Sequence, residues 1–174
     1  MTKILIVSDS HRWIDELDSI KKRHQAEVDL MIHCGDSELE ADQPEMERFI
    51  TVRGNCDYED KFPEEAEVNV GGHKIFITHG HLFAVKSTIM NLNYRAQELG
   101  ANIVCFGHSH YLGMEQIDHT LFINPGSIRL PRGRKERTYC ILELIDNKAD
   151  VTVYDLNDGE LEELRRSFIL SNDA

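Results

Sequence analysis

Residues 4–11 read ILIVSDSH, a run of four apolar residues followed at once by Ser8, Asp9, Ser10 and His11. A short apolar run rich in β-branched residues predicts a buried strand, and the polar group marks the place where that strand ends. The same order, an apolar run and then polar side chains, recurs four more times. This repetition decides which fold class the chain can adopt.

The four further runs end in the same kinds of side chain. They are LMI at 30–32 before His33–Asp36, FITV at 49–52 before Arg53–Asp57, IFIT at 75–78 before His79–His81, and IVCF at 103–106 before Gly107–His110. In an open α/β sheet, ligands bind at the carboxyl ends of the strands, where residues distant in sequence meet. We therefore expect these five polar groups to converge.

Other segments complete the predicted secondary structure. Strands are predicted at 121–123, 139–145 and 151–156, with a hairpin-like connection at 146–148, and helices at 13–25 and 87–99. Gly100 is the expected C-cap of the second helix, and Pro44 begins a third, short one. Segment 160–170 fits helix and strand equally. The first six apolar runs are nearly continuous, which predicts strands covered on both faces. The pattern indicates an α/β protein with two sheets, or one sheet with mixed edges, flanked by helices.

Composition indicates one soluble domain over residues 1–174, since 41% of the residues are hydrophobic, 29% are charged and no linker or repeat is evident. The N-terminal apolar run is too short for a signal peptide or a membrane span, so we expect a cytoplasmic protein. A net charge of −12 opposes binding to long nucleic acids and anionic membranes. The basic segment 129–137, RLPRGRKER, is predicted to be a solvated loop rather than a phosphate-guiding patch.

Cysteines and the remaining histidines mostly favour structural roles. No CxxC pair is present, and three cysteines lie in apolar runs, which predicts buried, reduced thiols at Cys34, Cys105 and Cys140. Cys56, in the sequence GNCD, is the exception. Four histidines outside the candidate ligand set are predicted to be structural or solvated: His24, His33, His73 and His119.

The polar groups taken together predict a metal centre. Each motif alone fits a turn, and Ser10 alone fits a helix cap. Together, two aspartates, four or five histidines and the amide oxygen of Asn55 form a mixed nitrogen and oxygen set, which suits Mn²⁺, Fe²⁺, Ni²⁺ or Zn²⁺ better than Ca²⁺ or Mg²⁺. Seven candidate ligands exceed the needs of one ion. Two ions about 3.5–4 Å apart that share a carboxylate would use them and would activate a bridging hydroxide for attack on phosphorus.

The ordered motifs Asp9-x-His11, Gly35-Asp36, Gly54-Asn55, His79 and Gly107-His108-x-His110 resemble the calcineurin-like metallophosphoesterase superfamily from residue 6 to about residue 127. GNCD, in place of the usual GNH, and Asn124–Ser127 are similar to its small prokaryotic phosphodiesterase branch. The resemblance implies a four-layer α/β/β/α sandwich of two mixed sheets. It also implies a dinuclear phosphodiesterase with Mn²⁺ as the favoured ion and a small phosphodiester or nucleotide-like substrate; a homo-oligomer is compatible with these features.

The resemblance also assigns roles to single residues. It places one ion on Asp9, His11, Asp36 and His110, and the second on Asp36, Asn55, His79 and His108, with Asp36 bridging. Asp36, Asn55, Cys56 and His81 are the expected catalytic residues. Most members carry a leaving-group histidine at the position of Cys56; because a thiol is a poorer acid and uncharged, we expect good leaving groups to be favoured unless His81 or a metal-bound water substitutes. His81, Asp57 and the turn 124–127 each fit either a supporting role or plain loop structure.

Other classes are weaker alternatives. A cysteine phosphatase needs Arg six residues after its nucleophile, and the corresponding positions here hold Glu40, Phe62, Tyr111 and Asp146. An aspartyl-phosphate enzyme built on Asp9 needs a second Asp where His11 stands. The remaining alternative is a catalytically weak or inactive protein-binding module of the same fold, as in the retromer scaffold subunit.

Overall fold

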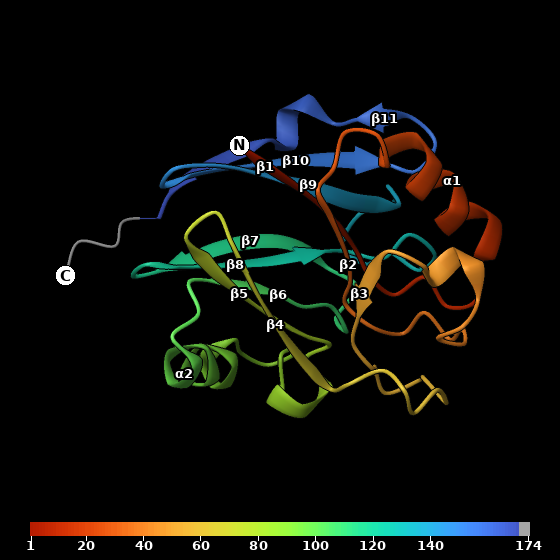
Figure 1. Cartoon of the computed structure of the whole chain (residues 1–174), viewed down its shortest axis with the longest axis horizontal. Helices are drawn as coiled ribbons and strands as arrows, with labels where there is room; N and C mark the ends of the chain where they lie inside the picture. The colour runs from red at the N-terminus through yellow and green to blue at the C-terminus, as the bar shows by residue number, and fades with distance from the viewer. Residues whose placement is uncertain (171–174) are drawn as a thin grey trace.

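Two β-sheets packed face to face form the centre of the computed structural model, which describes residues 1–170 (Figure 1). The seven-stranded sheet has the order β11-β10-β9-β1-β2-β3, with β12 also paired to β10. Its strands are β1 (Thr2–Val7), β2 (Leu30–His33), β3 (Phe49–Thr51), β9 (Thr138–Ile145), β10 (Lys148–Asp155), β11 (Gly159–Glu160) and β12 (Arg166–Ile169). The five-stranded sheet has the order β4-β5-β6-β8-β7. Its strands are β4 (Glu65–Val70), β5 (His73–Thr78), β6 (Ile103–Cys105), β7 (Leu112–Ile117) and β8 (Thr120–Pro125).

Helices cover the outer faces of both sheets, so the predicted four-layer α/β/β/α architecture is confirmed. The helices are α1 (Ile14–His24) and α2 (Met90–Leu99), with 3₁₀ helices η1 (Pro44–Met46), η2 (His81–Phe83) and η3 (Glu162–Leu164). Leu17 and Ile20 of α1 pack on the seven-stranded sheet, and Leu92 and Ala96 of α2 pack on the five-stranded sheet. Figure 1 shows the two helices on opposite sides of the paired sheets.

The central strands are buried on both faces, which explains their unbroken apolar runs. In β1, Ile4 and Ile6 face the core between the sheets, whereas Leu5 and Val7 face the layer of α1. Because successive side chains of a strand point to opposite faces, a strand between two packed layers needs apolar residues at every position. The same prediction is wrong for β3: Phe49 and Ile50 are only partly buried, because β3 lies at the end of its sheet.

Four strands have no counterpart among the predicted runs, namely β4, β7, β11 and β12. Strands β4 and β7 are the two edges of the five-stranded sheet and carry charged residues such as Glu65 and Glu115, which hide the apolar signal. Segment 160–170, which fitted helix and strand equally, contains both η3 and β12. Helix α2 begins at Met90 rather than at residue 87, and it ends as expected at Gly100 in the left-handed conformation.

The parallel part of each sheet directs several strand ends towards one region. Strands β1, β2 and β3 run parallel in one sheet, and β5, β6 and β8 run parallel in the other. Backbone hydrogen bonds then join the loops that follow: Asp9 N–H donates to the Gly35 oxygen at 3.0 Å, and Gly107 N–H donates to the His79 oxygen at 2.9 Å. The five polar groups therefore meet, as expected for strand ends in an α/β sheet. Within the described residues, we find no helix with the length and apolar character that crossing a bilayer requires.

Candidate metal centre

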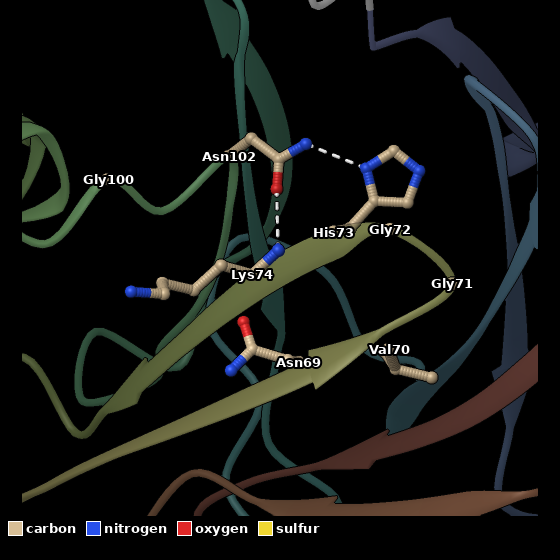
Figure 2. Close-up of a pocket in the computed structure, with 8 residues that line it drawn as sticks. All are labelled: Asn69, Val70, Gly71, Gly72, His73, Lys74, Gly100 and Asn102. Carbon is tan, nitrogen blue, oxygen red and sulfur yellow. Dashed lines mark hydrogen bonds between the residues drawn. The ribbon is translucent and has the colours of Figure 1, made fainter.

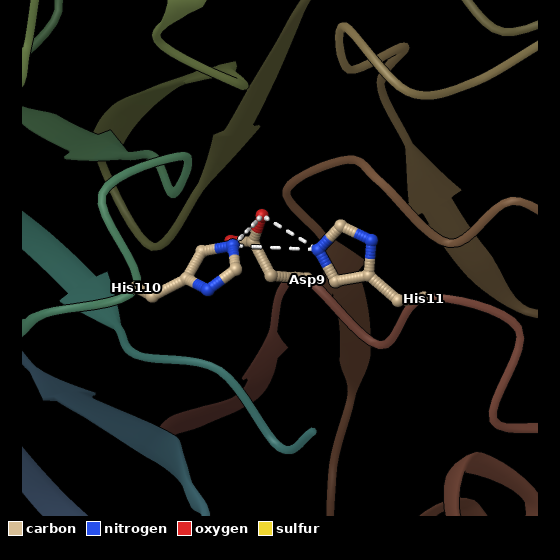
Figure 3. A group of neighbouring side chains, drawn as sticks. All are labelled: Asp9, His11 and His110. Atoms are coloured by element: carbon tan, nitrogen blue, oxygen red, sulfur yellow. Dashed lines mark hydrogen bonds and ion pairs between the residues drawn. The ribbon is translucent and has the colours of Figure 1, made fainter. Parts of the chain in front are cut away.

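Asp9, His11 and His110 form a compact group in the loops after β1 and β6 (Figure 3). Asp9 is fully buried, and its Oδ1 atom makes no hydrogen bond with the described residues. That oxygen lies 3.3 Å from His110 Nε2 and 3.8 Å from His11 Nε2. A buried carboxylate oxygen without a partner costs free energy unless a positive charge compensates it.

Hydrogen bonds on the far side of the two rings define which nitrogen carries the proton. Nδ1 of His11 donates to Glu38 Oε1 at 2.8 Å, and Nδ1 of His110 donates to the Leu130 backbone oxygen at 2.8 Å. Because a carboxylate and a carbonyl only accept, each Nε2 keeps its lone pair when the ring is neutral. The two Nε2 atoms are 3.3 Å apart. Facing lone pairs beside a carboxylate require a shared positive charge, either a proton or a metal ion, and such outer hydrogen bonds are typical of metal-binding histidines.

His79, after β5, is the centre of a second group with the same property. Its Nδ1 donates to the Cys34 backbone oxygen at 2.7 Å, so its Nε2 faces Asp36 Oδ2 at 3.1 Å and Asn55 Oδ1 at 3.1 Å. All three atoms that meet here are acceptors. Asp36 Oδ2 also lies 4.0 Å from His11 Nε2, so this carboxylate stands between the two groups.

The pKa shifts of these residues also indicate that the two groups favour a positive charge. Burial alone would raise the pKa of Asp9, but the neighbouring His110 and His79 outweigh it and lower the pKa; His79 does the same for Asp36. Burial would lower the pKa values of His79 and His110, but Asp36 and Asp9 respectively raise them. The shifts show that each group favours positive charge, and its set of carboxylate, amide and imidazole atoms fits a divalent cation.

His108 and His81 lie beside His79 rather than between the carboxylates. The His79 ring centroid is 5.1 Å from that of His108 and 5.5 Å from that of His81. Burial, followed by the charge on His79, lowers the pKa of His108 to about 4 and lowers that of His81 as well. Both rings are thus neutral near pH 7, and the neutral form is the one that binds metals. Nδ1 of His81 is buried and has no hydrogen-bond partner among the described residues.

Cys56 is exposed and lies at the edge of the same cluster. Its Sγ belongs to a group with His11 and Asp36 in which the three ligand atoms lie within 4.8 Å of one another. Its backbone N–H donates to Asp36 Oδ1 at 2.9 Å. Burial and then the Asp36 carboxylate raise the pKa of the thiol to about 11, so it is protonated near pH 7 and not a nucleophile there. The other three cysteines are buried and free, as predicted.

Asp57 joins the loops after β2 and β3. Its Oδ2 accepts from the backbone N–H groups of Asp36 at 2.9 Å and Gly54 at 2.7 Å, and its Oδ1 accepts from Glu38 N–H at 2.7 Å. Of the two interpretations of Asp57, the geometry favours the supporting role. Its buried carboxylate positions Asp36 and the backbone that carries Asn55.

Two glycines let the loops approach one another closely. A Cβ atom on Gly54 would lie 2.1 Å from Asp36 Oδ1, and one on Gly107 would lie 2.1 Å from Ser8 Oγ. The ligand loops are also strained, because seven non-glycine residues in them have positive φ: Asp9, His11, Arg12, Asp36, Glu38, His108 and His110. Such conformations cost about 1 kcal/mol or more each and gather at functional sites.

His33 and Ser10 connect the first two loops beneath the cluster. Gly35 N–H donates to His33 Nδ1 at 3.1 Å, so His33 Nε2 carries the proton and donates to Ser10 Oγ at 2.9 Å. Ser10 is therefore not the cap of α1, whose N-cap residue is Trp13. Burial lowers the pKa of His33 to about 4, although the charge on Asp9 opposes this.

His33 should make the stability of the metal-free protein depend on pH. A His in the unfolded chain has a pKa of about 6.5, so between that pH and about pH 4 the unfolded chain binds a proton that folded His33 does not bind. The contribution of His33 to the unfolding free energy is therefore complete above about pH 6.5 and is lost towards pH 4. Relative to His33→Gln, wild type should lose about 2 kcal/mol of unfolding free energy between about pH 7 and pH 4.5. Urea unfolding in chelator measures this difference, with the exposed His119→Gln as control. A difference that does not change with pH would contradict the assignment.

The basic segment 129–137 is a loop with exposed residues such as Arg132 and Lys135, as predicted, and parts of it also pack against the cluster. The Arg129 guanidinium donates to the backbone oxygen of His11 and lies over the Trp13 ring, 5.8 Å from its centroid. Arg132 N–H donates to the His110 backbone oxygen at 3.1 Å. Charge pattern alone does not reveal such contacts, because the acceptors are backbone carbonyls of residues distant in sequence.

The turn 124–127 also faces the cluster. The Ser127 hydroxyl donates to the Asp9 backbone oxygen at 2.8 Å and accepts from Leu130 N–H at 2.8 Å. Nδ2 of Asn124 donates to Ser109 Oγ at 3.0 Å, between the two histidines of the 108–110 loop. The turn therefore supports the loops that carry Asp9 and His110.

A pocket of about 510 Å³ at the β4–β5 turn lies apart from this chemistry (Figure 2). Asn102 Nδ2 donates to His73 Nδ1 at 2.7 Å, and Lys74 N–H donates to Asn102 Oδ1 at 3.0 Å. His73 Nε2 donates to the Asp146 oxygen at 2.7 Å, and Lys74 Nζ donates to the Leu99 oxygen at 3.0 Å. The His73 ring, the Asn102 amide and the Lys74 ammonium are thus engaged with the protein, and His73 has the structural role predicted for it.

Known structures identify the class of fold. A Streptococcus pneumoniae TIGR4 protein described as a predicted phosphoesterase superposes with a TM-score of 0.92, at 35% identity and 97% coverage of both chains. Vps29 of Chaetomium thermophilum shares the fold at 19% identity and a TM-score of 0.81, with 98% of each chain covered. The architecture is that of the metallophosphoesterases.

Sequence comparison then gives the family. The model of the calcineurin-like phosphoesterase superfamily domain matches residues 2–147. The probable metallophosphoesterase YsnB of Bacillus subtilis is 52% identical over 96% of this chain and 99% of YsnB. The phosphodiesterase YfcE of Escherichia coli K12 is 34% identical over 66% of this chain and 60% of YfcE. The chain belongs to the calcineurin-like phosphoesterase superfamily, as its ordered motifs suggested.

Proposed function

We propose that this protein is a dinuclear metal-dependent phosphodiesterase that hydrolyses small phosphodiesters. The observation that carries the proposal is the pair of places where only acceptor atoms meet: Asp9 Oδ1 with two Nε2 atoms, and His79 Nε2 with two oxygen atoms. We assign one divalent ion to Asp9, His11, Asp36 and His110, and the other to Asp36, Asn55, His79 and His108. The position of Asp36 between the two groups supports its role as the shared ligand.

When bound, the two ions would supply a water activated near neutral pH and positive charge beside the phosphoryl oxygens. The chain holds the donor atoms in place before a substrate arrives. Glu38, Leu130 and Cys34 orient three of the rings by accepting their Nδ1 protons. Preorganised donors of this kind cost no reorganisation during the reaction.

The surroundings favour a small anionic substrate. Lys86 lies near His108 and Arg132 near His110, and the charge of each cation acts to lower the pKa of the neighbouring ring, although Asp9 raises the pKa of His110 overall. These cations place positive charge at the rim of the cluster in a chain of net charge −12. The protein as a whole repels long polyanions, whereas the cluster attracts one phosphate group. Mn²⁺ is our preferred ion because it accepts a mixed set of carboxylate, amide and imidazole donors.

Cys56 and His81 are proposed to set which esters react. Cys56 stands where most family members have a histidine, and its protonated, uncharged thiol offers little help to a departing alkoxide. The His81 ring centroid lies 5.5 Å from that of His79, and we assign to His81 contact with the departing oxygen. The enzyme should therefore depend strongly on the leaving group.

This proposal is tested by hydrolysis of bis-p-nitrophenyl phosphate and of p-nitrophenyl phosphate with Mn²⁺, with and without chelator. We expect metal-dependent cleavage, at least roughly tenfold faster for the diester than for the monoester. A monoester has a second anionic oxygen, and the uncharged Cys56 thiol does not supply the positive charge that a histidine at this position would place beside it. Phenyl esters of rising leaving-group pKa measure the dependence on the leaving group. No turnover with any divalent ion would instead support the scaffold alternative, a protein-binding module of the same fold.

A further inference from the structure

We propose that Cys56 is a thiolate ligand for soft divalent ions, which completes a Zn²⁺- or Cd²⁺-selective site with His11 and Asp36 at the edge of the metal centre. The inference rests on the proposed function, because it shares two ligands with the proposed catalytic ions. It goes further because it gives the metal centre a second form, in which the bound ion also has the Cys56 sulfur as a ligand. Two independent features of the structure carry it.

The first feature is the position of the sulfur. Cys56 Sγ, a His11 ring nitrogen and an Asp36 carboxylate oxygen all lie within 4.8 Å of one another. Around a tetrahedral Zn²⁺ with bonds of about 2.0 to 2.3 Å, ligand atoms are roughly 3 to 4 Å apart, so the three atoms need only a small approach. Cys56 is exposed, whereas its backbone N–H is fixed on Asp36 Oδ1 at 2.9 Å. The side chain can therefore rotate towards an ion while its backbone stays in place.

The second feature is a buried acceptor beside His11, the residue that belongs both to the group with Cys56 and to the group with Asp9. Asp9 Oδ1 is buried, has no hydrogen-bond partner among the described residues and lies 3.8 Å from His11 Nε2. Nδ1 of His11 donates to Glu38, so Nε2 is the nitrogen available to an ion. A cation held by His11 thus has the Asp9 carboxylate oxygen near it in one group and Cys56 Sγ near it in the other.

The chemistry of sulfur gives the site its selectivity. As a sulfur–metal bond forms, the S–H proton passes to solvent, so binding releases one proton and adds one negative ligand. Thiolates favour Zn²⁺ and Cd²⁺ over Mn²⁺, which prefers oxygen donors. The added negative charge also lowers the positive charge presented to a phosphate. The Zn²⁺ form should therefore bind phosphodiesters more weakly than the Mn²⁺ form.

Cobalt spectroscopy of the full chain, without any substrate, tests the proposal. Wild type titrated with Co²⁺ should show both visible d–d bands and a near-ultraviolet sulfur-to-cobalt charge-transfer band, and Cys56→Ser and Cys56→Ala should keep only the first. Competition titrations should show Zn²⁺ affinity falling at least about tenfold in both variants, with Mn²⁺ affinity changing less than about threefold. The other three cysteines are buried and contribute no background from exposed thiols.

The outcomes separate this inference from the proposed function. Wild-type d–d bands without a charge-transfer band, or equal Zn²⁺ affinity in wild type and both variants, would overturn ligation by Cys56 and leave the metal centre standing. No Co²⁺ spectrum in wild type would overturn both. As a second measurement, Zn²⁺ should protect the Cys56 thiol of wild type from an aromatic disulfide reagent and Mn²⁺ should not; equal protection by the two ions would overturn the selectivity.

Discussion

Replacing Asp36 by asparagine should abolish Mn²⁺ binding and phosphodiester turnover together, with turnover falling at least roughly a thousandfold. Asp36 Oδ2 lies 3.1 Å from His79 Nε2 and 4.0 Å from His11 Nε2, so it is the one carboxylate oxygen assigned to both ions. The amide keeps the size of the side chain but removes its negative charge. Because each ion then loses a charged ligand, we expect both to bind weakly.

Calorimetric titration with Mn²⁺ and initial rates with bis-p-nitrophenyl phosphate measure the two effects in Asp36→Asn. The exposed Asp60→Asn is a matched control, since it makes the same chemical change away from the cluster. Circular dichroism establishes that the variant is folded. Wild-type turnover in folded Asp36→Asn would refute the two-ion assignment, and loss of turnover with unchanged Mn²⁺ binding would place Asp36 outside the ligand set.

Asp57→Asn should have the second-largest effect, although Asp57 contacts no proposed ion. Its carboxylate accepts three backbone N–H groups at 2.7 to 2.9 Å. The amide replaces one acceptor oxygen by an NH₂ group that faces backbone donors, so at least one buried N–H loses its partner. We expect a loss of about 2–3 kcal/mol of unfolding free energy and a rise of about tenfold to a hundredfold in the Kd for Mn²⁺.

The two effects of Asp57→Asn can be separated by saturating the variant with metal. If Asp57 positions the Asp36 and Asn55 loops, high Mn²⁺ should recover much of the activity, because the ligands themselves are still present. Urea unfolding with and without Mn²⁺, and rates against Mn²⁺ concentration, make the comparison, again with Asp60→Asn as control. Unchanged stability and unchanged Mn²⁺ affinity would show that the three hydrogen bonds do not position the loops.

Much of the fold can be predicted from the sequence because two signals mark each buried strand: its apolar run and the polar residues that follow it. β1 is the clearest case: Ile4 to Val7 are buried on both faces, and Asp9 and His11 follow directly. The apolar-run signal does not detect the edge strands β4 and β7. Two of the six residues in each are exposed and none is fully buried, so charged residues break the run although the backbone still pairs.

The candidate ligands could be predicted from the sequence, but the groups that orient them by hydrogen bonds could not. Strand order brings Asp9, Asp36 and His79 together, and their residue types suit metals whatever the fold details. The groups that orient them are a backbone oxygen at Cys34, another at Leu130 and the side chain of Glu38, which no local pattern marks. Such contacts depend on the relative placement of loops, which becomes visible only in three dimensions.

The central claim is that two ions occupy the two places where acceptor atoms face each other. A crystal structure of the Mn²⁺-soaked protein, with anomalous data collected near the manganese edge, tests it directly. We predict two anomalous peaks per chain about 3.5–4 Å apart, one beside Asp9, His11 and His110 and the other beside His79 and Asn55, with Asp36 touching both. A single peak, or peaks away from these residues, would contradict the account.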